Sequence, residues 1–284
     1  MSFFNRNVID LTDDEFHLLR DYIYENTGIY FKDNKKYLLI NRLNQRLIET
    51  NSKTFKDYYF YLKYDKTGVE FKKLLNSITT NETSFFRNEF HMESFSDFII
   101  PELVKKKKNN GDRKIKIWSA GCSTGEEPYS LAIILNEKGV MQEFDVEIIG
   151  NDLSDNVLNS ARAGIYNKLS LRNTPEYIVN KYFKKINNFT FKIDDKIKKY
   201  VKFTFGNLVK PSTLLLINNL DIIFCRNVMI YFDIEARKRV VKLFYDKLLK
   251  GGYLFIGHSE TLHGISTAFK IVHYKRAVFY RKDE

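Results

Sequence analysis

The sequence predicts an α/β protein: a sheet of mainly parallel strands with helices on both faces, preceded by a helical N-terminal segment. Three observations lead to this prediction. Residues 115–139 have the pattern of a buried strand, a glycine-rich turn and a helix. Strand-like and helix-like patterns then alternate towards the C-terminus, as in sheets with right-handed crossovers. The N-terminal third shows helical periodicity instead.

Four helices are expected in that N-terminal third. Thr12 and Glu15 have the spacing of a capping box, and the helix that follows should end at Gly28. A third helix, FKDYYFYLKY, should begin after Thr54, and a fourth, VEFKKLLNSI, after Gly68. The aromatic residues of the third helix are expected to belong largely to a core.

The second helix, about Lys35 to Glu49, is amphipathic. One face carries Leu39, Leu43 and Leu47. Another carries three basic residues at helical spacing, Lys35, Arg42 and Arg46. Such a basic face is suited to an acidic partner helix, although a solvated outer face of a helix bundle has the same pattern.

The stretch TTNETSFFR, 79–87, brings an amide, a hydroxyl and a guanidinium into one short turn, through Asn81, Thr83 and Arg87. A helix cap with a surface arginine would have the same residues. A helix should begin at Glu89 and end before KKKKNNGDRK, 105–114, for which an exposed loop is predicted. The domain boundary is expected between about 80 and 110.

The stretch IKIWSAGCSTGEEPY, 115–129, indicates a ligand site at the end of a strand. Its small residues, including Ala120 and Gly121, allow the backbone to approach a ligand closely. Glu126 and Glu127 follow at the helix start and would repel a phosphate, and the loop has neither the P-loop lysine nor a full GxGxxG pattern. A ligand that is neutral or cationic at this point is expected, such as an adenosyl group carrying methionine. A plain tight turn between strand and helix is the alternative.

Two later strands should end at the same edge of the sheet. VEIIGND, 146–152, ends in Asp152, which is placed to accept the hydroxyls of a ribose. LDIIFC, 220–225, is followed by Arg226 and Asn227. Cys122 and Cys225 would both lie near this edge, as small packing residues.

The C-terminal half contains further predicted elements. Residues 180–205 predict a β-hairpin that turns at Asp194-Asp195, inserted where a crossover helix would be expected. A helix from Asp233 to Lys250, the strand of GGYLFIGHSE, and two final strands, FKIVHY and AVFYRK, should follow.

Composition limits the possible classes. The chain has 284 residues, 44% of them hydrophobic, and only two cysteines, so it is no disulfide scaffold and a cytosolic protein is expected. We expect neither a membrane span nor a signal peptide, and no metal site. The net charge of +11 is concentrated in residues 31–73 and 181–202, which suggests an acidic macromolecular partner or a solvated lysine surface.

Five motifs in fixed order resemble the CheR family, the chemotaxis receptor glutamate O-methyltransferases. They are NETSFFR, WSAGCSTGEEPYS, NDLSDNVLNSARAGIY, FCRNVMIYF and LFIGHSE. The resemblance covers about residues 10 to 281. It implies an S-adenosylmethionine-binding α/β domain at 111–284 with a small antiparallel insertion at about 180–203, a helical receptor-docking domain at 1–85, and a linker helix at 86–110.

The resemblance also implies site residues. Arg87 and Tyr231 would be catalytic, with Arg87 near the carboxylate of the cofactor or the transferred methyl. Asn81 and Thr83 would lie over the methionine end, and Glu126 or Glu127 would approach from the first loop. The remaining implied contacts to S-adenosylmethionine are Ala120, Gly121, Asp152, Asn207, Leu208, Arg226 and Asn227. Tyr231 has no such signal of its own and by pattern is a core tyrosine.

The implied function is methylation of glutamates in the cytoplasmic domains of transmembrane chemotaxis receptors. We expect a cytoplasmic monomer recruited to membrane receptor arrays. Receptor binding should be independent of a C-terminal peptide tether, because the insertion stretch KKINNFTFKIDDKIKK has no glycine-containing loop.

Two other functions fit parts of the sequence. A nucleic-acid methyltransferase would suit the basic charge, but a base-amino enzyme would show an Asn/Asp-Pro-Pro-aromatic turn, and the chain has no Pro-Pro. A non-catalytic module that binds cofactor and receptor is the second alternative, and the intact Arg87 and Tyr231 argue against it.

Overall fold

The computed structural model describes residues 9–283, which form two compact units. The first contains the residues up to Thr80 together with Tyr231–Asp233, and the second contains Asn81–Ile230 and the residues from Ile234 onwards. The stretch MSFFNRNV, for which no signal peptide was expected, lies outside the described residues. Among the helices of residues 9–283, none has both the length and the apolar character needed to cross a membrane.

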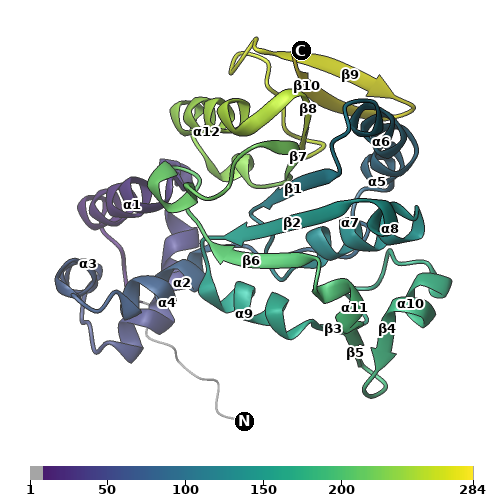
Figure 1. Cartoon of the computed structure of the whole chain (residues 1–284). Coiled ribbons are helices and arrows are strands. Elements are labelled where there is room, and N and C mark those ends of the chain that lie inside the picture. Colours follow the sequence, from purple (N-terminus) through teal and green to yellow (C-terminus); the bar gives the residue numbers. More distant parts are fainter. Residues whose placement is uncertain (1–8, 284) are drawn as a thin grey trace. The chain divides into compact units, whose positions relative to one another are not determined.

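The helical unit contains the four predicted helices: α1 (Asp13–Thr27), α2 (Lys36–Glu49), α3 (Phe55–Tyr64) and α4 (Val69–Ile78), as Figure 1 shows. The Thr12–Glu15 capping box is confirmed, and Gly28 ends α1 in the left-handed conformation. Thr54 and Asp57 form a second capping box at α3. Leu39, Leu43 and Leu47 are all fully buried, so the apolar face of α2 is confirmed as a core face.

The basic face predicted for α2 is wrong at Arg46. Its guanidinium is buried and donates to both carboxylate oxygens of Glu70, at 2.8 and 2.7 Å. Tyr58 donates its hydroxyl to the same carboxylate at 2.9 Å. Arg42 is also engaged, since it donates to the carbonyl of Ile78 and, at 2.8 Å, to the hydroxyl of Thr80. Both arginines therefore join α2 to other parts of the helical unit. The periodicity of α2 could not reveal this, because the partner of Arg46, Glu70, lies in another helix.

The larger unit has a seven-stranded sheet in the order β6-β2-β1-β7-β8-β10-β9. The strands are β1 (Lys114–Ala120), β2 (Asp145–Asp152), β6 (Val201–Phe205), β7 (Leu220–Cys225), β8 (Leu248–Ile256), β9 (Phe269–Tyr274) and β10 (Ala277–Lys282). The first five are parallel, and β10 and β9 extend the sheet antiparallel. The carboxyl ends of five strands therefore lie at one edge, where ligands bind in such sheets.

Helices cover both faces of this sheet, as predicted (Figure 1). The helices of this unit are α5 (Glu89–Ser94), α6 (Ile100–Asn109), α7 (Glu126–Glu137), α8 (Val140–Glu143), α9 (Asp155–Ala163), α10 (Glu176–Tyr182) beside the small sheet, α11 (Asp195–Lys198) and α12 (Ile234–Lys247), with a π-helix at Phe95–Ile99. Trp118 of β1 packs edge-on against Phe244 of α12, with ring centroids 5.3 Å apart. On the other face Phe224 of β7 packs against Phe95, at 5.6 Å. Large aromatic side chains thus fix the helical layers to the sheet.

The lysine run at 105–108 lies at the C-terminal end of α6, so the predicted loop at 105–114 is wrong up to Asn109 and right for 110–113. Lysines are favourable at a helix C-terminus because they complement the helix dipole. Lys107 is buried, and its ammonium lies 2.8 Å from an oxygen of Asp221 and 2.7 Å from one of Asp112. This pairing extends the helix to Asn109.

The small antiparallel insertion is confirmed, with a different turn. Its sheet has the order β3-β5-β4 and contains β3 (Ile165–Asn167), β4 (Phe183–Lys185) and β5 (Thr190–Ile193). The hairpin turns between β4 and β5, and not at Asp194-Asp195 as predicted. Asp194 instead caps α11 by accepting from the backbone N–H of Lys196 at 2.7 Å. The following stretch, from Val201, is β6 of the main sheet.

Candidate active site

The loop after β1 is held tightly against neighbouring strands. The backbone N–H groups of Gly121 and Cys122 both donate to the carbonyl of Asn151 at 2.9 Å. Gly121 has φ 75°, and a Cβ there would lie 2.5 Å from Val228. Gly125 has φ 92°, and a Cβ there would lie 2.9 Å from Ala161. Glycine is therefore required at both positions, and Ala120, directly before them, is buried.

Asp152 stands at the carboxyl end of β2, as predicted. One carboxylate oxygen accepts from the N–H of Ser123 at 2.9 Å, and the other accepts from the N–H of Ser154 at 3.0 Å. Burial raises the pKa of Asp152, and these N–H donors act in the opposite direction. A carboxylate has about four acceptor positions, so Asp152 fixes the loop and keeps capacity for a further donor.

The two glutamates at the start of α7 have different surroundings. Glu126 is buried, and its carboxylate accepts from the hydroxyls of Thr124 at 2.6 Å and Ser170 at 3.1 Å. Burial raises its pKa. Glu127 accepts from the hydroxyl of Ser119 at 2.7 Å, beside the end of β1. The sequence left open which glutamate serves a ligand, and these contacts favour Glu127, because Glu126 is committed to an internal network.

Arg226 joins three segments of the site. It is buried and follows β7 directly. One guanidinium nitrogen donates to the carboxylate of Glu127 at 3.1 Å, and another donates to the backbone carbonyl of Arg87 at 2.6 Å. Burial lowers the pKa of Arg226 and the carboxylate of Glu127 opposes that shift. The buried charge thus fixes the segment around Arg87 to the strand ends.

The predicted polar turn at 79–87 is anchored from both ends. The ring of Phe85 is fully buried and packs edge-on against Tyr166, with centroids 4.7 Å apart. The carbonyl of Asn81 accepts from the hydroxyl of Ser123 at 3.2 Å, which ties this turn to the glycine loop. Thr83 is partly exposed in the same turn, and Arg87 is partly exposed and donates to the carbonyl of Glu82 at 2.9 Å.

Three other predicted residues lie in loops at this edge. Asn207 and Leu208, both buried, follow β6, and the side chain of Asn207 accepts from the N–H of Val209 at 3.0 Å. Asn227 follows Arg226 and has φ 60°, a left-handed conformation that asparagine tolerates. Topology places these loops with the end of β2 and the glycine loop along one edge of the sheet.

Two family models match the chain. The model of the all-alpha domain of CheR methyltransferase matches residues 14–79. The model of the S-adenosylmethionine-binding domain of CheR methyltransferase matches residues 81–278, which is more than half of the chain. The chain belongs to the CheR family of methyltransferases.

Individual relatives extend over nearly the whole chain. The chain is 37% identical over 277 residues to chemotaxis protein methyltransferase 2 of Vibrio cholerae serotype O1, which covers 97% of this chain and 95% of that protein. It is 39% identical over 263 residues to the chemotaxis protein methyltransferase of Borreliella burgdorferi, with 92% of each covered. Among solved structures, the chain is similar to magnesium protoporphyrin IX methyltransferase of Synechocystis PCC 6803, with 96% of this chain and 97% of that chain covered. The TM-score of 0.33 and the identity of 13% are too low for any conclusion about this chain.

The residues present fit S-adenosylmethionine, the ligand of this CheR domain. The carboxylate of Glu127 lies beside the end of β1, where it would repel a phosphate and suit a ligand that is neutral or cationic at this point. Asp152 retains acceptor capacity for a ribose hydroxyl. Buried Cys122 and Cys225 have pKa values well above the ordinary one, which leaves them as packing residues, as the sequence suggested.

Tyr231 belongs to the helical unit in the structure. Its carbonyl accepts from the N–H of Tyr30 at 2.9 Å, and the next residue, Phe232, forms a β-bridge with Ile29. Its assignment to the CheR active site rests on its place in the chain, four residues after Asn227, and stays a prediction.

Sequence reasoning missed two polar residues at this edge. Asn151 accepts from the indole N–H of Trp118 at 2.7 Å and donates to the carbonyl of Gly206 at 2.9 Å, which links three strands. Glu260 accepts from backbone N–H groups of the loop after β7. An asparagine inside an otherwise apolar strand pattern is a signal that could have been used for the first. Glu260 lies within LFIGHSE, but nothing in its neighbours indicates its partners.

Proposed function

We propose that the protein transfers the methyl group of S-adenosylmethionine to glutamate side chains of chemotaxis receptors and so forms glutamate methyl esters. The observation that carries this proposal is the arrangement of the glycine loop, Glu127 and Asp152 at one edge of the sheet in a CheR-family chain. The names of the chemotaxis relatives support the receptor as the acceptor.

The proposal includes the cofactor contacts that the family resemblance implies. Asp152 accepts from the ribose, and Asn207 and Leu208 flank the adenine. Asn81, Thr83 and Arg87 lie over the methionine end of the cofactor, and Ala120 and Gly121 contact it through the backbone of the glycine loop. Glu127 approaches the cofactor while Glu126 supports the loop from behind. Arg226 and Asn227 close the site at the end of β7.

The chemistry requires little acid–base help from the protein. S-adenosylmethionine supplies a methyl group that its positive sulfur already activates. The acceptor carboxylate is ionised at neutral pH, since the reference pKa of glutamate is about 4.3. The residues of the chain must hold the carboxylate in line with the methyl group and exclude water. Arg87 and Tyr231 are assigned to this orientation, and neither is consumed.

Arg87 is better suited to positioning than to tight pairing. A close ion pair with the acceptor would lower the nucleophilicity of the carboxylate. Its backbone is fixed by Arg226 and its guanidinium donates to the carbonyl of Glu82. The flanking residues Phe86 and Asn88 have φ of 52° and 63°, so this short segment is conformationally constrained.

A transfer assay tests the proposal. The protein is incubated with methyl-labelled S-adenosylmethionine and membranes that contain chemotaxis receptors. Label should enter the receptor band and be released by mild base, as expected for an ester. Label in added DNA or RNA would favour a nucleic-acid methyltransferase instead, and cofactor binding without any transfer would favour a non-catalytic module.

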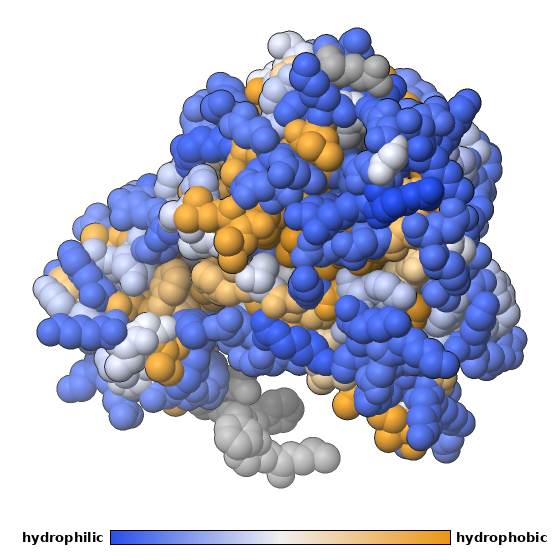
Figure 2. Space-filling view, in the orientation of Figure 1, coloured by the Kyte–Doolittle hydropathy of each residue, from blue (hydrophilic) through white to orange (hydrophobic). Residues whose placement is uncertain are grey.

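The proposal includes receptor binding that does not require a C-terminal tether. A peptide adding to the small sheet could pair only with β3 or β4, and each has three residues. The β4–β5 turn is compact, with the N–H of Ile186 donating to the carbonyl of Thr190 at 2.9 Å. Ile186 and Phe189 are exposed beside it, and Figure 2 shows a small hydrophobic patch at this hairpin, apart from the larger hydrophobic area in the middle of the same face.

The helical domain, 1–85, is the proposed docking part, with 86–110 as linker helix and 111–284 as the catalytic domain of a cytoplasmic monomer recruited to receptor arrays. Because Arg46 is buried, docking must use exposed lysines such as Lys35, Lys63 and Lys66. Methylation rates should be alike for receptors with and without their last residues and should fall as salt screens surface charge. Tight binding of a receptor C-terminal peptide, with methylation lost on its removal, would contradict this.

A further inference from the structure

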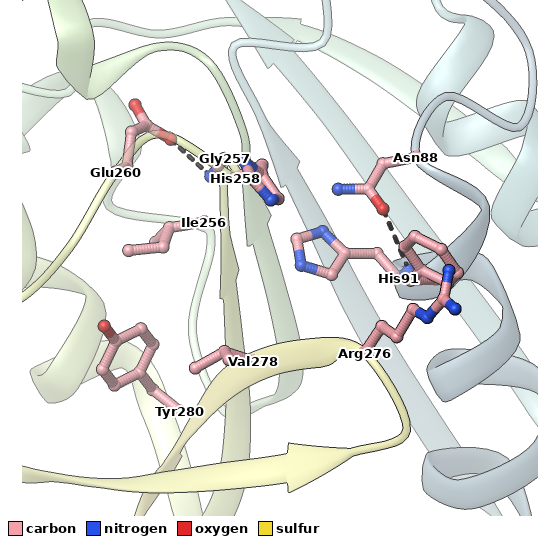
Figure 3. Close-up of a pocket in the computed structure, with 10 residues that line it drawn as sticks. Asn88, His91, Ile256, Gly257, His258, Glu260, Arg276, Val278 and Tyr280 are labelled. Atoms are coloured by element: carbon pink, nitrogen blue, oxygen red, sulfur yellow. Dashed lines mark hydrogen bonds between the residues drawn. The ribbon is translucent and has the colours of Figure 1, made fainter.

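The carboxylate of Glu260 gathers three backbone N–H groups from two segments. It accepts from Asn227 at 3.0 Å and from Ile230 at 3.1 Å, both in the loop after β7. It also accepts from Gly257, directly after β8 (Figure 3). Hydrogen bonds to an ionised acceptor are roughly twice as strong as neutral ones. Glu260 therefore joins the loop after β7 to the end of β8.

The backbone around Glu260 is shaped for this contact. A Cβ on Gly257 would lie 2.5 Å from a Glu260 carboxylate oxygen and 2.8 Å from the backbone nitrogen of Asn227. Only glycine at 257 therefore allows the two segments and the carboxylate to meet. The N–H of Glu260 donates back to the carbonyl of Gly257 at 2.9 Å, which closes a tight turn. Gly257 and Glu260 act as one structural unit.

The loop after β7 is held from two sides. Arg226 ties its start to Glu127 and to the carbonyl of Arg87. Glu260 ties Asn227 and Ile230 to the neighbouring strand end. Arg237 of α12 also donates to the carbonyl of Met229 at 2.8 Å, and the side chain of Met229 is buried. Glu260 is therefore one of three charged side chains that fix this loop.

The surroundings of Glu260 show that its role is not to fill a core. It lines a cavity of about 130 Å³ together with Asn88, His91 and His258 (Figure 3). Burial and the charge of Arg226 lower the pKa of His91 to about 4, so His91 is neutral at pH 7. Arg276 also lines this cavity. Within residues 9–283, the hydrogen bonds of the Glu260 carboxylate come from the backbone N–H groups of Asn227, Ile230 and Gly257.

We propose that Glu260 is a positioning residue for methyl transfer. It acts through the loop 227–230, whose last residue is followed directly by Tyr231 in the chain. Fixing Asn227 and Ile230 sets the course of the chain up to Ile230, the residue directly before Tyr231. This inference rests on the proposed function in that Tyr231 is taken to orient the acceptor.

The variant Glu260→Gln tests the inference with almost no change in shape. Its amide NH2 would face backbone N–H donors, and its charge is lost. The matched control is Glu235→Gln on α12, where an exposed glutamate pairs with Lys238 at 3.0 Å. Both variants are made in the full-length protein and compared by melting temperature before any other measurement.

Amide hydrogen exchange gives a readout that needs no activity. In Glu260→Gln, exchange at the amides of Asn227 and Ile230 should rise by about tenfold or more, because a charged acceptor has been removed. Exchange at Gly121 and Cys122, which donate to Asn151, should stay as in the wild type. Unchanged exchange at 227 and 230, or an equal rise throughout the domain, overturns the inference.

Kinetics test the consequence. Glu260→Gln should lower kcat, measured at saturating S-adenosylmethionine, by about tenfold or more, while Glu235→Gln leaves kcat unchanged. If Glu260 acts through Tyr231, the double variant with Tyr231→Phe should be no slower than Tyr231→Phe alone. Losses that multiply would overturn the inference. If Tyr231→Phe leaves kcat unchanged, the role assigned to Tyr231 is wrong. The exchange rates and the kcat of Glu260→Gln then decide whether Glu260 is a positioning residue.

Discussion

Replacing Asp152 with asparagine should weaken cofactor binding and leave the fold intact. The amide keeps one oxygen as an acceptor but turns an NH2 group towards the N–H of Ser123 or Ser154, each now within 3.0 Å of the carboxylate. Loss of a charged hydrogen-bond acceptor costs about 1–3 kcal/mol. Since about 1.4 kcal/mol is a factor of ten, the Kd for S-adenosylmethionine should rise by about 5- to 150-fold.

Calorimetric titration with S-adenosylmethionine and with S-adenosylhomocysteine measures this change. Both ligands carry the ribose, so both should lose affinity by a similar factor. The control is Asp145→Asn at the opposite end of the same strand, where an exposed aspartate lies 3.9 Å from Lys114. Equal affinities for wild type and Asp152→Asn would refute the ribose assignment.

Three further predictions concern single side chains. Tyr231→Phe should lower kcat by about tenfold with little change in cofactor affinity, and weaker cofactor binding with normal turnover at saturation would contradict its role. The pKa of His91 is lowered from 6.5 to about 4, so as the pH falls the unfolded chain takes up this proton before the folded one does. The free energy of unfolding should therefore fall by up to about 3 kcal/mol between pH 6.5 and 4. Urea denaturation at a series of pH values measures this fall, and His91→Gln should remove it. Glu70→Gln removes the buried one of the two carboxylates that pair with Arg46 and should cost the helical domain about 3–5 kcal/mol by calorimetry, whereas Glu49→Gln removes the exposed one and should cost far less.

The elements set by local chemistry could be predicted from the sequence. The capping box at Thr12 and the glycine at position 28 define α1 through contacts between near neighbours in the chain. The proximity of the glycine loop and Asp152 could also be predicted from the sequence, because parallel strands bring their carboxyl ends to one edge of the sheet. Positive φ at Gly121 and Gly125 then explains the small residues that marked the site.

What could not be predicted depends on partners distant in sequence. Arg46 has the position of an outer residue on its own helix, but Glu70 lies 24 residues later and draws it into the core. Lys107 lies in a lysine-rich stretch whose composition is typical of a loop, but its ion pair with Asp221 stabilises a helix there. The choice between Glu126 and Glu127 likewise needed Ser170 and Arg226, which no local pattern connects to α7.

Mapping the methylated atom tests the central claim most directly. The cytoplasmic domain of a chemotaxis receptor is incubated with the protein and S-adenosylmethionine, and its peptides are sequenced by mass spectrometry. We predict a methyl group on a glutamate side chain, absent without the cofactor and removed by mild base. A methyl group that resists base, one located on a lysine or on nucleic acid, or no transfer to a receptor that binds the protein would contradict glutamate O-methylation.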